Sequence, residues 1–228
     1  MNPLRFATSV FLASRTLRLA CVALAAGTAG VGTSGCSVLP EPQADPTRYY
    51  LLAAETSQGA KASEPQRSEA QLHLALRVVE LPGYLRNNRT LVIRSGVNEV
   101  IYQDYARWAE PLDLAVQRIV RDRLLGSGRV ATAQVAPFSA EIQRDFDITV
   151  RVLRCEGGME PGGRQTSRFS AVYEIADAKA GRVLVREVFD APAEVWDGRN
   201  YAALAQHLSA GVAALGEEIV GKLPPDQP

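Results

Sequence analysis

A continuous apolar stripe along residues 201–219 places the strongest constraint on the fold of this 228-residue chain. Apolar residues recur there every three or four positions, the spacing of one helix face: Tyr201, Leu204, Ala205, Leu208, Val212, Leu215 and Ile219. Asp197 is the expected N-cap of this helix, and Pro224-Pro225 cannot continue it. A helix with one apolar face must bury that face against another layer, so the stripe predicts a layered domain.

A second helix and a set of short strands are the candidates for the rest of that domain. Pro111 suits the first helical position of a segment that ends at Gly126, with the apolar stripe Leu112, Ala115, Val116, Ile119, Val120 and Leu124. Alternating apolar and polar residues predict a sheet of about six strands, drawn from residues 48–53, 72–79, 90–94, 99–105, 148–152, 169–175 and 183–187. The predicted fold class is α+β, a mostly antiparallel or mixed sheet with two amphipathic helices on one face.

The first 35 residues have the pattern of an export signal. Three arginines precede an apolar run over residues 19–26, and no acidic residue occurs before Glu41. A basic start, an apolar core of about 7–15 residues and a small-residue exit are typical of such signals. The run is shorter than the roughly 20 apolar residues that a transmembrane helix requires.

Cys36 lies where the cleavage site of this signal should fall. Ser34-Gly35-Cys36 resembles the lipobox of bacterial lipoproteins, although Thr33 stands where that motif usually has Leu. The sequence therefore predicts cleavage before Cys36 and lipid attachment to its thiol; the alternative is an ordinary secretory signal that contains a cysteine. Ser37, rather than Asp, resembles the outer-membrane sorting signal of Gram-negative lipoproteins.

The predicted cleavage divides the chain into a signal peptide (1–35), a lipidated N-terminus with a flexible tether (36–47), a single α+β domain (48–223) and a disordered tail (224–228). Residues 55–70 are polar and rich in Gly, Pro and Ser, which predicts a mobile loop or a second linker. Removing 35 of the 228 residues leaves 193, with 22 basic and 25 acidic side chains. This balance offers no polybasic surface, so no nucleic-acid partner is expected.

Candidate catalytic and metal-binding residues are few. His73 and His207 lie in separate elements, and Cys155 has no second ligand nearby, so no metal or cofactor site is predicted. Asp145 and Asp147 face the same side of a strand and could divide acid and base roles, but strand edges commonly carry such pairs. The glycine cluster at 157–163 lacks the ending of a phosphate-binding loop and is expected to form a hairpin loop. No catalytic residue is predicted, and the chain is not expected to be an enzyme.

Several motifs in a fixed order carry a resemblance to a known family. Tyr49-Tyr50-Leu51-Leu52 opens the domain, and a strand then ends in a turn that contains Pro82, Tyr84 and Leu85. After a hairpin, the second helix begins with Trp108, Ala109, Glu110, Pro111 and Leu112. With the lipobox, this order resembles the PqiC-like family, the auxiliary lipoproteins of ABC-type and MCE-type transport systems.

The resemblance implies a non-enzymatic part in the transport of lipids or other hydrophobic compounds across the periplasm, and in membrane integrity. It implies an outer-membrane lipoprotein, acylated at Cys36 (palmitate included), that docks a substrate-binding MCE protein. An inner-membrane permease would be reached through that MCE protein, and several copies could form a ring. The alternatives are a periplasmic lipid-binding carrier, which needs an apolar cavity, and a hydrolase that uses Asp145 and Asp147.

The family motif itself has two interpretations. In the structural one, Trp108 covers the end of the core, Pro111 presets the first helical turn, and Glu110 complements the helix dipole. In the functional one, Tyr84, Tyr105 and Trp108 form a patch that faces a partner, because aromatic residues are enriched at such contacts.

Overall fold

The computed structural model describes residues 43–53, 72–86, 89–139 and 142–225. The predicted signal peptide, Cys36, most of the tether, the 55–70 loop and the end of the tail lie outside the described residues. The chain divides into two units, residues 1–45 and 46–228, and the fold described below is that of the second.

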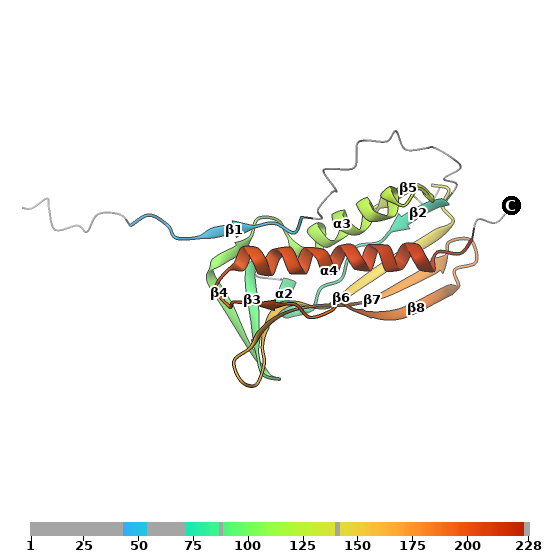
Figure 1. Cartoon of the computed structure of the whole chain (residues 1–228). Coiled ribbons are helices and arrows are strands. Elements are labelled where there is room, and N and C mark those ends of the chain that lie inside the picture. The colour runs from blue at the N-terminus through green and yellow to red at the C-terminus, as the bar shows by residue number, and fades with distance from the viewer. Residues whose placement is uncertain (1–42, 54–71, 87–88, 140–141, 226–228) are drawn as a thin grey trace, which may run out of the picture. The chain divides into compact units, whose positions relative to one another are not determined.

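This unit contains one sheet and three helices in its described part (Figure 1). The strands are β1 (Arg48–Tyr50), β2 (Leu72–Leu76), β3 (Thr90–Ser95), β4 (Glu99–Trp108), β5 (Val130–Val135), β6 (Phe146–Met159), β7 (Gln165–Asp177), β8 (Val183–Asp190) and β9 (Val195–Trp196). The helices are α2 (Gly83–Arg86), α3 (Leu112–Gly126) and α4 (Tyr201–Lys222).

The sheet has nine strands and is mixed, which confirms the predicted α+β class with more strands than expected. Its order is β1-β4-β3-β6-β2-β5, and β7 pairs with β6, β8 and β9. The hairpins β3–β4, β6–β7 and β7–β8 are antiparallel. By contrast, β1–β4, β2–β5, β2–β6 and β3–β6 are parallel. Strand β6 holds the sheet together, because β2 pairs with its first three residues and β3 with its last three.

The predicted position of the glycine cluster is partly wrong. Gly157 and Gly158 lie inside β6, paired with β7, and only residues 160–164 form the connecting turn. A Cβ atom on Gly157 would lie 3.2 Å from the Trp196 ring and 3.3 Å from the Leu204 side chain, besides a closer contact with Ile93. Glycine is needed there because strand, helix and neighbouring strand approach closely at this point.

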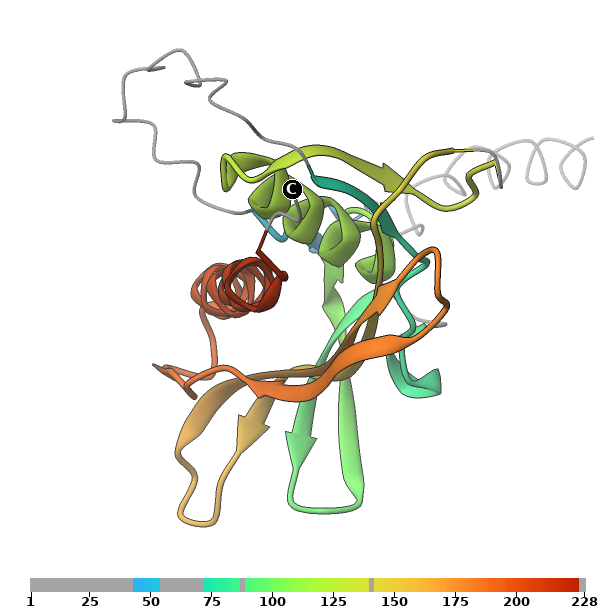
Figure 2. The same cartoon turned by 90° about the vertical axis from the view of Figure 1, so that its right-hand side faces the viewer.

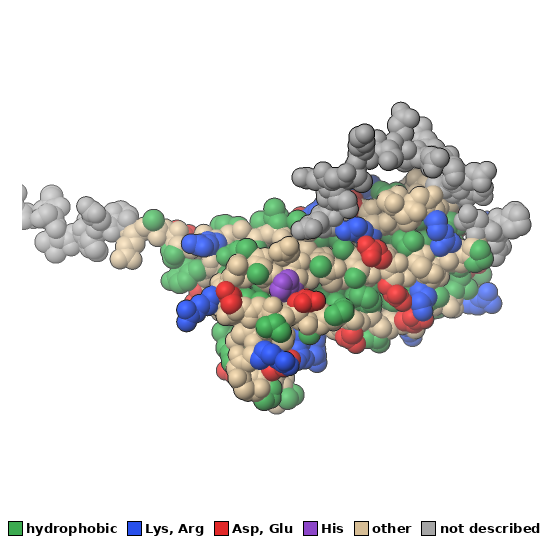
Figure 3. Space-filling view, viewed as in Figure 1, with side chains coloured by type: hydrophobic (Ala, Val, Ile, Leu, Met, Phe, Trp, Pro, Cys, Tyr) green, Lys and Arg blue, Asp and Glu red, His purple; other side chains and the backbone are tan. Residues whose placement is uncertain are grey.

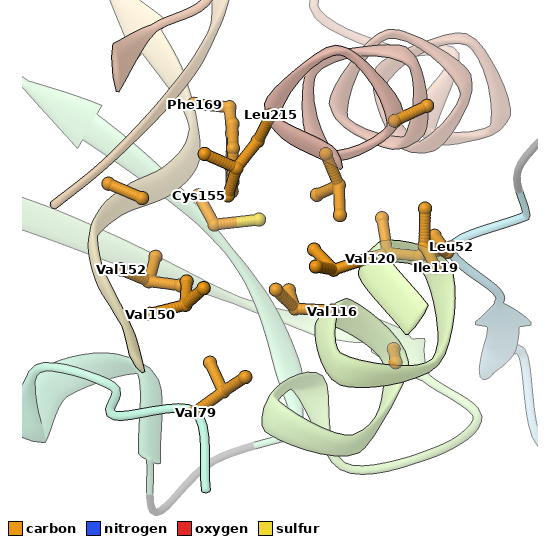
Figure 4. Packing of buried hydrophobic residues seen from close by; sticks show 14 of the residues in the cluster. Leu52, Val79, Val116, Ile119, Val120, Val150, Val152, Cys155, Phe169 and Leu215 are labelled. Atoms are coloured by element: carbon orange, nitrogen blue, oxygen red, sulfur yellow. The ribbon is translucent and has the colours of Figure 1, made fainter. Parts of the chain in front are cut away.

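The core lies between the sheet and the two long helices. Figure 2 shows α3 and α4 on the same, inner side of the curved sheet, as the two apolar stripes predict. Ile119 and Val120 of α3 and Leu204, Leu208 and Val212 of α4 are almost completely buried there. Side chains of β6 and β7, among them Val150, Val152, Cys155 and Phe169, meet them from the sheet (Figure 4).

The beginnings of both long helices differ from the sequence prediction by a few residues. Pro111 is the N-cap residue of α3 rather than its first helical residue, and its carbonyl accepts a hydrogen bond from the Ala115 N–H (3.1 Å). The N-cap of α4 is Asn200, whose side chain accepts from the Ala203 N–H (3.2 Å). Asp197 instead closes the preceding turn, accepting from the N–H groups of Asn200 (2.6 Å) and Arg199 (2.8 Å). Asp and Asn both suit either role, so the sequence alone does not distinguish them.

The Asp197 turn predicts a pH dependence of stability. Hydrogen bonds from the backbone of Asn200 and Arg199 lower the pKa of the Asp197 carboxyl below its ordinary value of 3.8. A carboxyl of this kind stabilises the fold fully above its ordinary pKa, and the contribution is lost as the pH falls through the lowered value. We expect Asp197→Ala to lower the Tm at neutral pH, and the difference from the wild type to shrink below about pH 4 in thermal denaturation. A difference independent of pH would contradict this role.

Candidate functional site

The first half of the family motif is a turn of which only Leu85 is buried. Leu85 packs into the core, and its N–H donates to the Pro82 carbonyl (3.0 Å), which closes the short helix α2. The Tyr84 hydroxyl donates to the Leu153 carbonyl of β6 (3.3 Å), and the Tyr84 carbonyl accepts from the Tyr102 hydroxyl of β4 (3.3 Å). The turn therefore joins β4 to β6 on the outer side of the sheet.

A buried ion pair lies next to this turn. The Arg94 Nε atom of β3 is 2.5 Å from the Glu156 Oε1 atom of β6, and the Glu156 side chain has no exposed surface. The Arg94 guanidinium also lies 5.2 Å from the centroid of the Tyr84 ring. Burial, followed by the charge of Glu156, raises the pKa of the Tyr84 hydroxyl far above its ordinary range. Tyr84 is therefore neutral at all physiological pH values and acts as a hydrogen-bond donor.

The second half of the motif fixes β4 and α3 to the first strand. Trp108 is only 4% exposed. The backbone N–H of Trp108 donates to the Arg89 carbonyl (2.5 Å). The Ala109 N–H donates to the Tyr50 carbonyl of β1 (2.8 Å). Arg118 of α3 contacts both the Glu110 carboxylate (2.5 Å) and the Leu52 carbonyl (2.8 Å). These contacts support the structural interpretation of the Trp108–Leu112 segment.

The proposed patch of Tyr84, Tyr105 and Trp108 is wrong for Trp108, which faces the core beside Ala106. Tyr105 is 61% exposed, and Tyr84 is half-buried under Arg94. The sequence could not distinguish these positions, because β4 changes its register before Trp108. Val92 pairs with Tyr102, but Thr90 pairs with Arg107, so β4 has extra residues in this interval. Such a bulge redirects side chains, and here it leaves Tyr105 on the outside.

The same bulge borders a surface feature that we call the tyrosine–arginine groove. It consists of two adjoining hollows of about 420 and 660 Å³ that share Arg48, Tyr50, Arg199 and Tyr201. One hollow continues along β4 over residues 102–106, and the other follows the first turn of α4. In the space-filling view, basic side chains border apolar ones where β1 meets the beginning of α4 (Figure 3).

Tyr201 holds the floor of this groove in place. Its hydroxyl lies 2.6 Å from the Gln103 Oε1 atom of β4 and donates to it. Its ring lies 6.2 Å from the Tyr50 ring and 5.5 Å from the Trp196 ring, measured between centroids. Burial raises the pKa of the Tyr201 hydroxyl, which keeps it protonated. Three elements that are distant in sequence are thus fixed around one hollow. Sequence analysis missed the groove, because Arg48 and Arg199 belong to opposite ends of the domain.

The residues considered for catalysis take part in structural contacts. Asp147 forms ion pairs with Arg77 (2.6 Å) and Arg144 (2.8 Å), and the Asp145 carboxylate accepts from the His73 N–H (2.8 Å). Burial raises the pKa of the Cys155 thiol far above its ordinary range, which keeps it a thiol rather than a reactive thiolate. Within the described ranges, no group of three or more His, Cys, Asp or Glu side chains could hold a metal ion. Asp145 and Asp147 therefore gain no support as an acid–base pair.

The fold and its buried motifs define a small α+β domain, and no helix in the part that the structure describes is long and apolar enough to cross a membrane. The model of the family of ABC-type transport auxiliary lipoprotein components matches residues 50–220. The chain belongs to this family, which confirms the resemblance inferred from its motifs. No curated protein matches the chain.

Two crystal structures share the fold at low sequence identity. Protein XCC0632 from Xanthomonas campestris is 17% identical with a TM-score of 0.57, and the alignment covers 65% of this chain and 81% of that protein. An uncharacterized protein is also 17% identical with a TM-score of 0.56, over 77% of this chain and 98% of that one. At this identity, these similarities establish the fold alone.

Proposed function

We propose that this chain is a non-enzymatic lipoprotein subunit of an MCE/ABC-type system that transports lipids or other hydrophobic compounds. Lipid on Cys36 would hold it at the periplasmic face of the outer membrane, where the folded domain docks the MCE protein and supports membrane integrity. The inner-membrane permease would be reached through that MCE protein. The observation that carries the proposal is the family match, which extends over nearly all of the folded unit.

The packing of the domain favours docking over the alternative of a lipid-binding carrier. A carrier needs an apolar cavity large enough for an acyl chain. Here the space between sheet and helices is occupied by side chains with almost no exposed surface, among them Ile119, Val120, Leu208 and Val212. The tyrosine–arginine groove is an open surface feature of mixed polarity rather than an apolar chamber. Docking through the outer surface is therefore the better-supported function.

Affinity purification of the tagged full-length protein from membranes tests this proposal. We expect the wild type to be labelled by radioactive palmitate, to fractionate with the outer membrane, and to bring down an MCE protein. Cys36→Ala should abolish the label and the outer-membrane location, because stable anchoring requires the acyl chains. Cys21→Ala is the matched control, and it should behave like the wild type.

The same preparation separates the alternatives. Recovery of the tagged protein without any MCE protein would overturn the docking function. A palmitate label that persists in Cys36→Ala would overturn Cys36 as the site of the lipid anchor. A stoichiometric lipid extracted from the purified domain and identified by mass spectrometry would favour the carrier. Native mass spectrometry of the recovered complex would determine whether several copies form a ring.

A further inference from the structure

Strand β8 lies at an edge of the sheet, beside β7 (Figure 1). Among the described strands it pairs with β7 alone, so its other side is an edge without a neighbouring strand. Folded proteins usually protect such an edge with proline, with a very short strand or with a covering element. Residues 183–190 contain no proline, and Val188 is 61% exposed. This edge is therefore suited to pair with another strand.

The pairing of β8 with β7 determines which of its backbone groups are free. The Ala191 N–H, directly after β8, donates to the Phe169 carbonyl of β7 (3.0 Å). In an antiparallel ladder, residues that exchange hydrogen bonds with the neighbouring strand alternate with residues that point their N–H and C=O groups away from it. The second half of β8 follows this ladder without a register shift. The residues that point away from β7 are therefore Arg186, Val188 and Asp190.

The side chains of these three residues share the outer face of the sheet. Arg186 lies opposite Glu174 of β7 and forms an ion pair with it (2.7 Å), but the Arg186 side chain is still 65% exposed. A guanidinium group has five N–H donors, so it can bind a second carboxylate. The Asp190 side chain is exposed, and its carboxylate makes no hydrogen bond or ion pair with any described residue.

A second copy of this edge complements the first in one register. Two copies of one strand that pair about a two-fold axis run antiparallel, and each contact between different residues occurs twice. If Arg186 lies opposite the partner's Arg186, like charges meet, which is unfavourable. If it lies opposite the partner's Val188, neither charged residue meets an opposite charge. If the two Val188 residues lie opposite each other, Arg186 lies opposite the partner's Asp190 on both sides of the axis.

We propose that two copies of this protein pair through β8 about a two-fold axis, with the two Val188 residues at the axis. Each opposed pair of outward-pointing residues exchanges two N–H···O bonds, so the three pairs form about six hydrogen bonds. One sheet then continues across both copies. The contact uses the same patch on each copy and closes after two, so it is distinct from a ring.

The membrane anchor strengthens this pairing. A ladder of three outward-pointing residues is small beside the roughly 20–30 residues a side of a standard interface, so the dimer is weak in free solution. Lipid on Cys36 would confine the copies to one membrane plane and raise their effective concentration. The strength of the dimer thus rests on the proposed anchor. Its geometry rests on β8 alone and does not depend on the transport partner.

Cysteine cross-linking of the full-length lipoprotein in isolated membranes tests the contact. Opposed residues in a hydrogen-bonded strand pair have Cα atoms about 5.5 Å apart, within the range of a disulfide. We expect Val188→Cys to give a covalent dimer under mild oxidation. Val195→Cys is the matched control, because Val195 is also 61% exposed but lies on β9, and it should give only the background level of dimer. The native Cys155 is buried and should not contribute.

Exchange of charges tests the register. In the Val188→Cys background, Asp190→Arg should lower the dimer yield about tenfold, because two like-charge pairs replace two opposite-charge pairs. Adding Arg186→Asp recreates the opposite charges and should restore most of the yield. Both side chains are exposed, so these variants should fold, which thermal denaturation checks.

Three outcomes would each overturn the proposal: equal dimer from Val188→Cys and Val195→Cys, an unchanged yield with Asp190→Arg, or no recovery in the charge-exchanged protein. Absence of the dimer while the MCE protein still co-purifies would reject the β8 contact and leave the docking function intact.

Discussion

Replacing Arg94 by Met is expected to lower the free energy of unfolding by about 3–5 kcal/mol. Met keeps most of the volume of the side chain but removes the guanidinium, which leaves the Glu156 carboxylate without its ion-pair partner. The Glu156 side chain has no exposed surface, so water cannot replace that partner without opening the contact with Tyr84. Equilibrium denaturation by urea, followed by circular dichroism, measures the change.

A double-mutant cycle separates the ion pair from the loss of packing. Arg94→Met combined with Glu156→Gln should recover much of the lost stability, because no uncompensated buried charge remains. The control is Arg151→Met, since Arg151 forms a similar pair with Glu80 but the two side chains are 60% and 50% exposed. That substitution should cost less than about 1 kcal/mol. Equal costs for Arg94→Met and Arg151→Met would show that burial of the pair is unimportant.

The sequence predicts those parts of this fold that repeat a regular pattern. The stripe of residues 201–219 and that of residues 112–124 identify both long helices, because each must bury one face. Alternation identifies the middle of the long hairpin of β6 and β7, where buried residues alternate with less buried ones over residues 148–153 and 171–176. These patterns are local, because the orientation of each residue follows from residues only a few positions away in the sequence.

Features that depend on distant parts of the chain could not be predicted in this way. The two-residue strand β9 and the six-residue strand β5 form only because each pairs with a neighbouring strand. The parallel pairing of β2 with β5 and β6 is not encoded by any turn. The predicted strand of residues 72–79 ends at Leu76, and Val78 is exposed. In these cases tertiary contacts, rather than local propensity, determine the structure.

The residues of the candidate site also divide into those that a local sequence motif identifies and those that depend on contacts between distant parts of the chain. The motif residues Pro82, Leu85, Trp108 and Leu112 can be identified from the sequence, because they belong to the short motifs that carry the family resemblance. The pairing of Arg94 with Glu156 and the convergence of Arg48 with Arg199 were not found, because 62 and 151 positions separate the partners. Strand β6 also carries the charged residues Asp147, Arg151 and Arg154, so Glu156 gives no separate sequence signal of a buried ion pair.

Trp108→Ala is expected to lower the free energy of unfolding by about 3–5 kcal/mol, the usual cost of truncating a large buried aromatic residue. Trp108 contacts the core where β1, β4 and the beginning of α3 meet, so its loss opens a cavity there. Trp108→Phe should cost less, since it keeps part of the apolar volume. Tyr105→Ala, at an exposed position on the same strand, should change stability by about 0.5 kcal/mol or less.

These variants also decide between the two interpretations of the family motif. If Trp108 acts through the core, Trp108→Ala should lose the MCE partner only to the extent that the domain unfolds, and lowering the temperature should restore co-purification. A folded Trp108→Ala protein with an unchanged Tm that fails to recover the partner would instead make Trp108 a contact residue. Its 4% exposure argues against that outcome, because a side chain enclosed by its own domain has almost no surface to offer a partner.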